Sequence, residues 1–200
     1  MLVLESHDAE ADRLSFEREL IGGFERLDFS RGGKTAADED VELSFRLAFA
    51  GSAAMPDIGF FTCEQRHPAE HFWDAALQRH PNGVTGVAGA VFTAENPTDH
   101  HIFFSAFTGL RDFVSNSTGL RFATPRGEVE VITPVAFESR YGGAPPPGVR
   151  LSALRLSVAD PGRAGGMLEA GAIAFTERHD WIVVPAEAAH GMVIAFEPEG

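Results

Sequence analysis

The charged side chains that could do chemistry lie on short alternating segments, and the clearest of these reads Leu154-Arg155-Leu156-Ser157-Val158. Side chains of a strand point alternately to two faces, so the apolar residues of this segment are expected to pack against helices. Arg155 then points to the opposite face, which is expected to be the concave face of a curved sheet and is called the cup below. A guanidinium in a cup suits a carboxylate ligand, because the two groups form paired, charge-assisted hydrogen bonds. The alternative, a merely solvated face, stays open.

Two more arginines and two glutamates have a similar placement on alternating segments. Arg46 and Arg121 are expected to join Arg155 as ligand-binding residues of the cup. Glu130 and Glu197 are the candidate catalytic residues, since a carboxylate whose pKa is raised by burial can act as a proton-transfer base. An Arg155→Ala variant is expected to keep its fold and to lose affinity for a carboxylate ligand.

A connector rich in histidine and aromatic residues runs from Cys63 to Gly83. His67 and Trp73 in this connector are candidate ligand contacts. Two histidines and a carboxylate could bind zinc, iron or manganese, but the spacing here matches no metal motif. No metal site is therefore expected, and Glu64 with His67 would be the candidates if one existed. The competing interpretation is an ordered loop in which Trp73 fills an apolar gap.

Three segments of the chain share one plan of structural elements. In each, an apolar strand ends at a capping residue, a helix of about three turns follows, and short strands come after a glycine. The expected caps are Asp8, Asn96 and Asp160, whose side chains can accept amide protons at a helix start. The sequence thus predicts an α+β fold of three tandem βαβββ units, over residues 1–82, 83–148 and 149–200, the second closing with a linker from Tyr141 to Gly148. Curved mixed sheets with helices on the outside are expected.

Composition excludes several classes of partner. Sixteen Lys and Arg stand against 29 Asp and Glu, giving a formal net charge of -13, so nucleic acid and anionic membrane are disfavoured as partners. No apolar run approaches the roughly 18 residues that a membrane span requires. Cys63 is the single cysteine, and no export signal precedes the first strand, which favours a reducing, cytoplasmic location.

The chain resembles the glyoxalase-like proteins of the vicinal-oxygen-chelate superfamily. The resemblance spans nearly the whole chain and is carried by Leu2-Val3-Leu4-Glu5-Ser6, Gly59-Phe60-Phe61-Thr62-Cys63, His80-Pro81-Asn82-Gly83, Ala94-Glu95-Asn96-Pro97, Gly119-Leu120-Arg121 and Thr124-Pro125-Arg126-Gly127. Such proteins usually contain an even number of units, which pair to close a cup. The resemblance therefore implies that an earlier unit normally precedes Met1.

The resemblance also implies where a metal would be bound. Metal-dependent members place a histidine seven residues before the capping residue of a unit, and a glutamate in the last strand. The matching first-strand positions here are Met1, Gly89 and Ala153, none of which can bind a metal. The cofactor is therefore unknown, and a divalent metal would have to be bound without the first-strand histidines.

Two functions follow as hypotheses. The first is a glyoxalase-like lyase or isomerase that acts beside a carbonyl on an organic acid or thiol conjugate. The second is a non-catalytic metabolite-binding or sequestering protein of the same fold that has lost the metal site. In either case the partner is a small molecule. Three units leave one unpaired, which predicts a homodimer, unless the Cys63 to Gly83 connector covers the unpaired unit.

Overall fold

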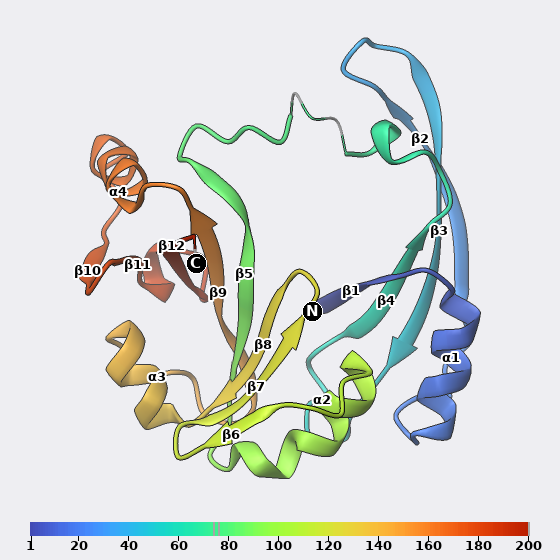
Figure 1. Cartoon of the computed structure of the whole chain (residues 1–200), viewed down its shortest axis with the longest axis horizontal. Helices are drawn as coiled ribbons and strands as arrows, with labels where there is room; N and C mark the ends of the chain where they lie inside the picture. Colours follow the sequence, from blue (N-terminus) through green and yellow to red (C-terminus); the bar gives the residue numbers. More distant parts are fainter. Residues whose placement is uncertain (74, 76, 200) are drawn as a thin grey trace. The chain divides into compact units, whose positions relative to one another are not determined.

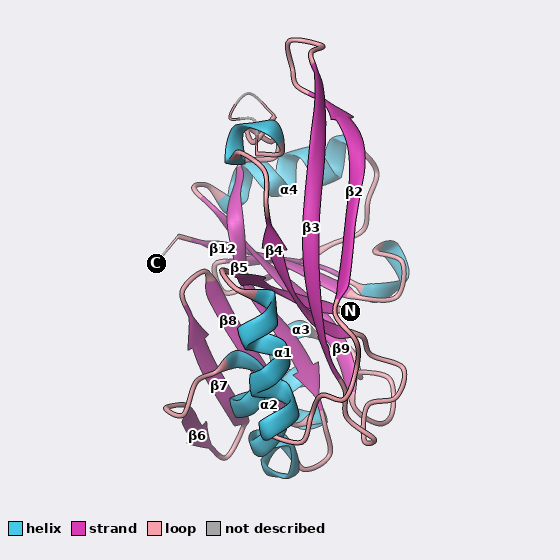
Figure 2. Ribbon diagram, turned by 90° about the vertical axis from the view of Figure 1, so that its right-hand side faces the viewer, coloured by secondary structure: helices cyan, strands magenta, loops and turns pink. Residues whose placement is uncertain are grey.

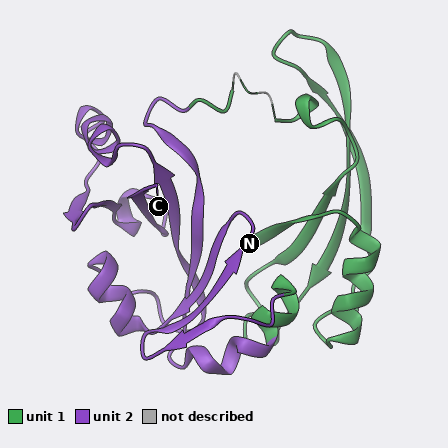
Figure 3. Cartoon of the chain, in the orientation of Figure 1, with its two compact units in different colours: residues 1–79, 103–109 green, residues 80–102, 110–200 purple. Residues whose placement is uncertain are grey.

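The computed structural model describes residues 1–73, 75 and 77–199, and these residues form two compact units (Figure 3). Unit 1 comprises Met1–Arg79 with Phe103–Gly109, and unit 2 comprises His80–Ile102 with Leu110–Gly200. Along the chain the elements repeat the order strand, helix, three strands three times (Figure 1). The expected α+β fold of three βαβββ repeats is confirmed. No helix within the described ranges is both long and apolar enough to cross a membrane.

Unit 1 contains one mixed sheet of four strands in the order β1-β4-β3-β2. Strand β1 pairs in parallel with β4, and the other pairs are antiparallel. Strands β2 and β3 form the long hairpin seen in Figure 2. The elements are β1 (Leu2–Ser6), α1 (Ala9–Arg18), β2 (Leu27–Lys34), β3 (Asp40–Ala50), β4 (Phe60–Gln65) and the short 3-10 helix η1 (Ala69–His71).

Helix α1 begins where the sequence predicts, because the Asp8 carboxylate accepts the amide protons of Glu10 and Ala11. A further amide of the first turn, that of Ala9, donates to the carboxylate of Glu64 in β4 at 3.0 Å. This bond ties the positive end of the helix to the sheet. Helix α1 therefore covers the sheet face to which Glu64 points.

The second part of the same face is covered by α2 (His101–Thr108), whose residues from Phe103 onward belong to unit 1. Phe60 of β4 is 1% exposed and meets the rings of Phe103 and Phe107 edge-on, with centroids 4.7 and 5.3 Å apart. Phe107 also contacts Phe16 of α1 at 5.8 Å. These rings form the hydrophobic core of unit 1.

Unit 2 contains an eight-stranded sheet in the order β10-β11-β12-β9-β5-β8-β7-β6. Strands β5 and β9 pair antiparallel at its centre, and each has the last strand of its own repeat as a parallel neighbour. Two βαβββ repeats are thus joined through their first strands. The elements are β5 (Val84–Thr93), η2 (Pro97–His100), β6 (Val114–Asn116), β7 (Gly119–Thr124), β8 (Gly127–Ile132), α3 (Pro134–Tyr141), β9 (Arg150–Val158), α4 (Pro161–Ala170), β10 (Thr176–Arg178), β11 (Trp181–Val184), η3 (Ala186–Ala188) and β12 (Val193–Pro198).

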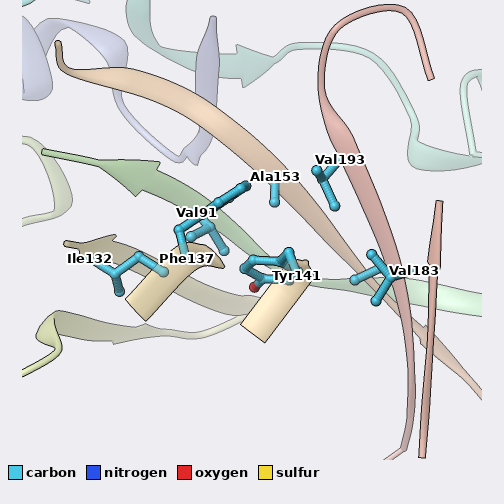
Figure 4. Packing of buried hydrophobic residues seen from close by; sticks show 8 residues of the cluster. Val91, Ile132, Phe137, Tyr141, Ala153, Val183 and Val193 are labelled. Carbon is cyan, nitrogen blue, oxygen red and sulfur yellow. The ribbon is translucent and has the colours of Figure 1, made fainter. Parts of the chain in front are cut away.

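Helices α3 and α4 pack on opposite faces of this sheet. Val158 and Leu156 of β9 belong to the apolar cluster around Ala164 of α4. Ala153 of the same strand packs with Phe137 of α3 instead (Figure 4). Because Arg155 alternates with Leu156, it points to the α3 side. Leu156 and Val158 therefore face a helix, α4, as the sequence predicts, but the face that carries Arg155 is also covered in part by a helix, α3.

Two local predictions were wrong. Helix α3 was not expected, and it occupies the end of the segment that we assigned to strands and to a linker beginning at Tyr141. Asn96 does not cap a helix with its side chain, since its amide donates to Asp99 and its oxygen accepts from the Thr98 hydroxyl. Side-chain partners therefore compete with the backbone amides at this helix start.

Candidate functional site

A pocket of about 680 Å³ opens on the α3 side of the sheet in unit 2. Its polar walls carry four arginines, Arg121, Arg140, Arg155 and Arg178, and its acidic residues are Glu128, Glu130 and Asp180. Leu120, Ile132 and Trp181 supply apolar wall. A concave site of this size with a few convergent polar groups is suited to a small molecule.

Arg155 lies at the centre of this charged group and contacts three glutamates. Its Nε and Nη2 atoms donate to the two oxygens of Glu197 at 2.7 and 2.8 Å. Its Nη1 atom donates to Glu128 at 2.8 Å and to Glu130 at 2.9 Å. A guanidinium has five N–H groups, so four of them are used by carboxylates from β8 and β12. We call Arg155, Glu128, Glu130 and Glu197 the arginine cage.

The arginine cage is largely removed from water. The side chains of Arg155, Glu130 and Glu197 are 11%, 7% and 13% exposed. Burial by itself would lower the pKa of Arg155, but its hydrogen bonds to Glu197 and the charge of Glu130 outweigh burial and raise the pKa. The Trp181 ring lies 5.4 Å from the guanidinium carbon and adds a cation-π contact. The guanidinium is therefore held as a permanent cation.

Two outer arginines extend the cage on either side. Arg121 of β7 donates to Glu128 at 2.9 Å, and Arg140 of α3 donates to Glu130 at 2.8 Å. Arg121 is half exposed and Arg140 is one-third exposed at the side chain. Because β7, β8, β9, β12 and α3 each contribute a charged group, the network holds these elements together.

Gly89 of β5 lies opposite Arg155 in the sheet register. A Cβ atom at Gly89 would stand 2.9 Å from the carbonyl oxygen of Glu128 and 3.4 Å from Nη1 of Arg155. A side chain there would have to displace its neighbours. This first-strand position therefore leaves room for the guanidinium rather than contributing a ligand.

The residues of the cup do not fit the divalent metal that the resemblance implies. Gly89 and Ala153 bring no donor atom, and the carboxylates of Glu128, Glu130 and Glu197 are all bonded to Arg155. Within the described part of the chain, no group of three or more His, Cys, Asp or Glu side chains is arranged to hold a metal ion.

A fourth arginine, Arg178 at the end of β10, reaches the pocket from the other side. Its Nη1 atom donates to the carbonyl oxygen of Ser139 at 3.1 Å. Its Nε atom is buried and has no hydrogen-bond partner among the described residues. Gly142 makes room for this guanidinium, since a Cβ there would overlap it. Gly142 can do so because it ends α3 in the left-handed conformation, with φ of 88°.

Tyr141 lies beneath this part of the pocket, packed against Phe137 and Trp181. Burial raises the pKa of its hydroxyl to about 12, against the opposing charge of Arg140. Sequence reasoning missed Arg140, Tyr141 and Arg178 as site residues. A signal was present, because Thr133 and Pro134 mark a helix start, and Gly142 marks its end.

The structure brings four of the sequence-predicted residues together, namely Arg121, Glu130, Arg155 and Glu197. It places Arg46, Glu64, His67 and Trp73 in unit 1. The expected placement of Arg46 in a cup was wrong. Arg46 lies opposite Glu64 in the sheet, on the face that α1 covers, and its Nε atom is 3.4 Å from Asp28.

The remaining predicted residues of unit 1 have separate partners. Glu64 accepts from Ala9 and from Arg66. His67 places Nδ1 about 3.0 Å from the carbonyl oxygen of Ser44, and its ring meets Phe45 edge-on at 4.9 Å. Trp73 donates from Nε1 to the side chain of Gln65 at 2.9 Å. Glu64 and His67 therefore engage different groups rather than one another.

No protein-family model and no curated protein matches the chain. Among solved structures, the chain is similar to a hypothetical protein from Staphylococcus aureus, with a TM-score of 0.60 and 9% identity over 98% of this chain. It spans 65% of the length of that protein. This likeness shows the fold alone, and in this chain the fold consists of the three βαβββ repeats that the sequence predicts.

Two further similarities are weaker and carry no argument by themselves. Methylmalonyl-CoA epimerase from Mycobacterium tuberculosis gives a TM-score of 0.46 with 11% identity, covering 61% of this chain and 93% of that protein. A glyoxalase/bleomycin resistance protein/dioxygenase from Nocardioides gives 0.24 with 14% identity, covering 56% and 81%.

Proposed function

We propose that unit 2 is a metabolite-binding domain whose pocket takes a small organic anion. The observation that carries this proposal is Arg178, which lines the pocket with a buried Nε donor that has no partner among the described residues. A buried donor left unbonded costs about 1 to 3 kcal/mol, so a ligand oxygen that accepts from it gains this energy on binding. A carboxylate matches a guanidinium best, because two of its oxygens can be bonded at once.

Arg121 and Arg178 suit the same ligand better than Arg155 does. Four of the five N–H groups of Arg155 already bond to glutamates. Arg121 is half exposed and, among the described residues, has one carboxylate partner, Glu128. The ligand anion is therefore expected between Arg121 and Arg178, with Arg155 as part of the floor. Trp181 offers an apolar surface for the rest of the ligand.

The competing function is a lyase or isomerase that moves a proton beside a carbonyl, with Glu130 or Glu197 as the base. It is supported by the location of Glu130 in the pocket wall. Against it, both carboxylates are bonded to the Arg155 guanidinium, so oxygens that would have to take a proton from a ligand are already occupied. The geometry therefore favours binding without catalysis.

Calorimetric titration with a panel of small carboxylates and acyl thioesters tests the proposal. For a ligand that binds, Arg178→Ala is expected to weaken affinity by about tenfold or more, since a charge-assisted hydrogen bond contributes about 1.5 to 3 kcal/mol. Arg163→Ala is the matched control, because Arg163 is an exposed arginine of unit 2 on α4. Equal affinity in both variants would contradict the assignment of Arg178. Turnover of any ligand that Glu197→Gln abolishes would favour the enzyme.

We also propose that the chain forms a homodimer through unit 1. Strand β1 is an edge strand that pairs only with β4 among the described residues. In unit 2 the equivalent first strands, β5 and β9, pair with one another. The unit 1 sheet also exposes Val3, Leu27 and Phe29 to 42%, 49% and 40%. An unpaired edge and an apolar face are surfaces that proteins usually cover.

Light scattering after gel filtration tests the homodimer. A dimer is expected, and Val3→Pro in β1 is expected to dissociate it, because proline cannot donate to a new strand pair. A monomer that persists as concentration rises would contradict the proposal.

The proposed setting is the cytoplasm, in keeping with the single cysteine, Cys63, which is a free thiol whose pKa burial raises.

A further inference from the structure

The arginine cage places three carboxylates in contact with one cation. Three carboxylates from two strands, β8 and β12, surround one guanidinium at the seam of the two repeats, with Glu197 on its Nε and Nη2 edge and Glu128 and Glu130 at Nη1. Several carboxylate oxygens around one cation are the donor set that hard divalent ions prefer. Here the cation is a side chain of the chain itself.

The charges in this group balance without an added ion. Glu128, Glu130 and Glu197 carry three negative charges, and Arg121, Arg140 and Arg155 carry three positive charges in direct contact with them. A divalent ion that entered would find each of the three cage carboxylates already bonded to the Arg155 guanidinium. It could bind only by displacing Arg155 from bonds of 2.7 to 2.9 Å.

The backbone opposite Arg155 is adapted to the same arrangement. Gly89 has no side chain, and a Cβ there would crowd both Nη1 of Arg155 and the backbone of Glu128. The position that would hold a first-strand ligand is thus the position that gives the guanidinium its space.

We propose that Arg155 is a protein-borne cation that stands in place of a divalent metal ion at the centre of the cup, and that its guanidinium closes the three-glutamate cluster to metal. This proposal does not rest on the ligand proposed above. As they stand around Arg155, the three carboxylates are not arranged to hold an ion. The proposal implies that loss of the guanidinium would free them to close on one.

Manganese binding, followed by electron paramagnetic resonance of free Mn²⁺, tests the proposal on the full-length chain. The unsubstituted protein is expected to show only weak, non-saturating binding from its excess of surface carboxylates. Arg155→Ala is expected to gain one saturable site at least about tenfold tighter. Arg155→Ala combined with Glu197→Gln is expected to lose that site, because one of the three donors is removed.

Two control variants separate the effect of position from the effect of charge. Arg155→Lys keeps a cation at the centre and is expected to stay closed to Mn²⁺. Arg121→Ala changes the net charge by the same amount as Arg155→Ala but leaves the centre filled, and it too is expected to stay closed. A gain of binding in Arg121→Ala equal to that in Arg155→Ala would show a general charge effect and overturn the proposal.

The unsubstituted protein provides a test that does not depend on the folding of any Arg155→Ala variant. Saturable, stoichiometric Mn²⁺ binding by the unsubstituted protein that Glu197→Gln abolishes would overturn the proposal. A folded Arg155→Ala variant that binds Mn²⁺ no better than the unsubstituted protein would do the same. If Arg155→Ala does not fold, non-saturating binding by both the unsubstituted protein and Arg155→Lys supports the proposal.

Discussion

Arg155 and Glu197 form a two-bond ion pair across neighbouring parallel strands, with Nε and Nη2 of the arginine 2.7 and 2.8 Å from the two carboxylate oxygens. The pair joins the first and last strands of the third repeat on the α3 side of the sheet. Both side chains are nearly buried, at 11% and 13% exposure. Each therefore needs the other to offset the loss of water.

The first prediction concerns stability and revises the sequence-based expectation for Arg155→Ala. That variant leaves three carboxylates without their shared cation, and we expect its free energy of unfolding to fall by about 3 to 5 kcal/mol. Arg121→Ala, which removes a half-exposed partner of Glu128, is expected to cost about 1 kcal/mol or less. Urea denaturation of both variants measures the difference. Equal denaturation midpoints would mean that the buried ion pairs of Arg155 contribute no more to stability than the half-exposed pair of Arg121.

The second prediction is an alkaline titration of Tyr141, the only tyrosine in the chain. Burial raises the pKa of its hydroxyl from 10.0 to about 12, so near-ultraviolet absorbance should report ionisation well above the ordinary range. Because the folded state holds the proton more tightly, this group contributes stability that is complete below the unfolded pKa. That stability is lost as pH rises through the folded pKa. Tyr141→Phe should remove the absorbance change and flatten the alkaline loss.

The third prediction concerns Glu64 and acid. Burial alone would raise the pKa of Glu64, but the Ala9 amide and the Arg66 guanidinium outweigh it and hold the pKa below its ordinary value of 4.5. A lowered pKa contributes stability that is present above the unfolded pKa and lost as pH falls through the folded pKa. Glu64→Gln is therefore expected to be less stable at neutral pH. Its stability should also depend less on pH in the acid range, as thermal melts at several pH values can show.

The fourth prediction uses two adjacent glycines. Gly142→Ala puts a Cβ atom in the left-handed conformation and against the Arg178 guanidinium, and it should cost about 1 to 2 kcal/mol. Gly143→Ala is the control, since a Cβ there meets nothing within 4 Å. Gly142→Ala should also weaken any ligand that depends on Arg178. Identical stability and affinity in the two variants would show that the end of α3 does not position Arg178.

The fifth prediction compares two helix starts. Asp8 accepts two backbone amides, so Asp8→Ala should lower stability by about 0.5 to 2 kcal/mol. The side chain of Asn96 bonds only to exposed neighbouring side chains in the described structure, so Asn96→Ala should cost about 0.5 kcal/mol or less. Chemical denaturation ranks the two. A larger loss of stability in Asn96→Ala than in Asp8→Ala would show that Asn96 caps its helix, as the sequence predicts.

The repeat order and the apolar face of β9 could be read from the sequence because both depend on local spacing. Asp8 and Asp160 lie beside their helices in the chain, and alternation along Leu154 to Val158 has a period of two residues whatever the tertiary structure. Helix α3 could also have been found, since Thr133, Pro134 and Gly142 are local signals. It was missed because the segment follows a strand directly.

The face of β3 could not be assigned by alternation alone. Alternation shows that Arg46 and Phe45 point to opposite sides, but it does not show which side a helix covers. In unit 1 the covered face carries the small residues Ala48 and Ala50 beside the Arg46 pairs, and aromatic residues such as Phe29 lie on the other face. The pattern of apolar residues therefore predicted the wrong face of β3 as the one that a helix covers.

By itself the sequence determined the class of fold, the charge that disfavours nucleic acid as a partner, and the residues that could form a cup. Only the tertiary structure decided that Arg155 would meet Glu128, Glu130 and Glu197, which lie 27, 25 and 42 residues away. The register of β9 against β5 and β12 sets those meetings, and register is a property of paired strands rather than of one segment. As a result Arg155, which the sequence predicts to bind a ligand, is bonded to three glutamates of the chain itself.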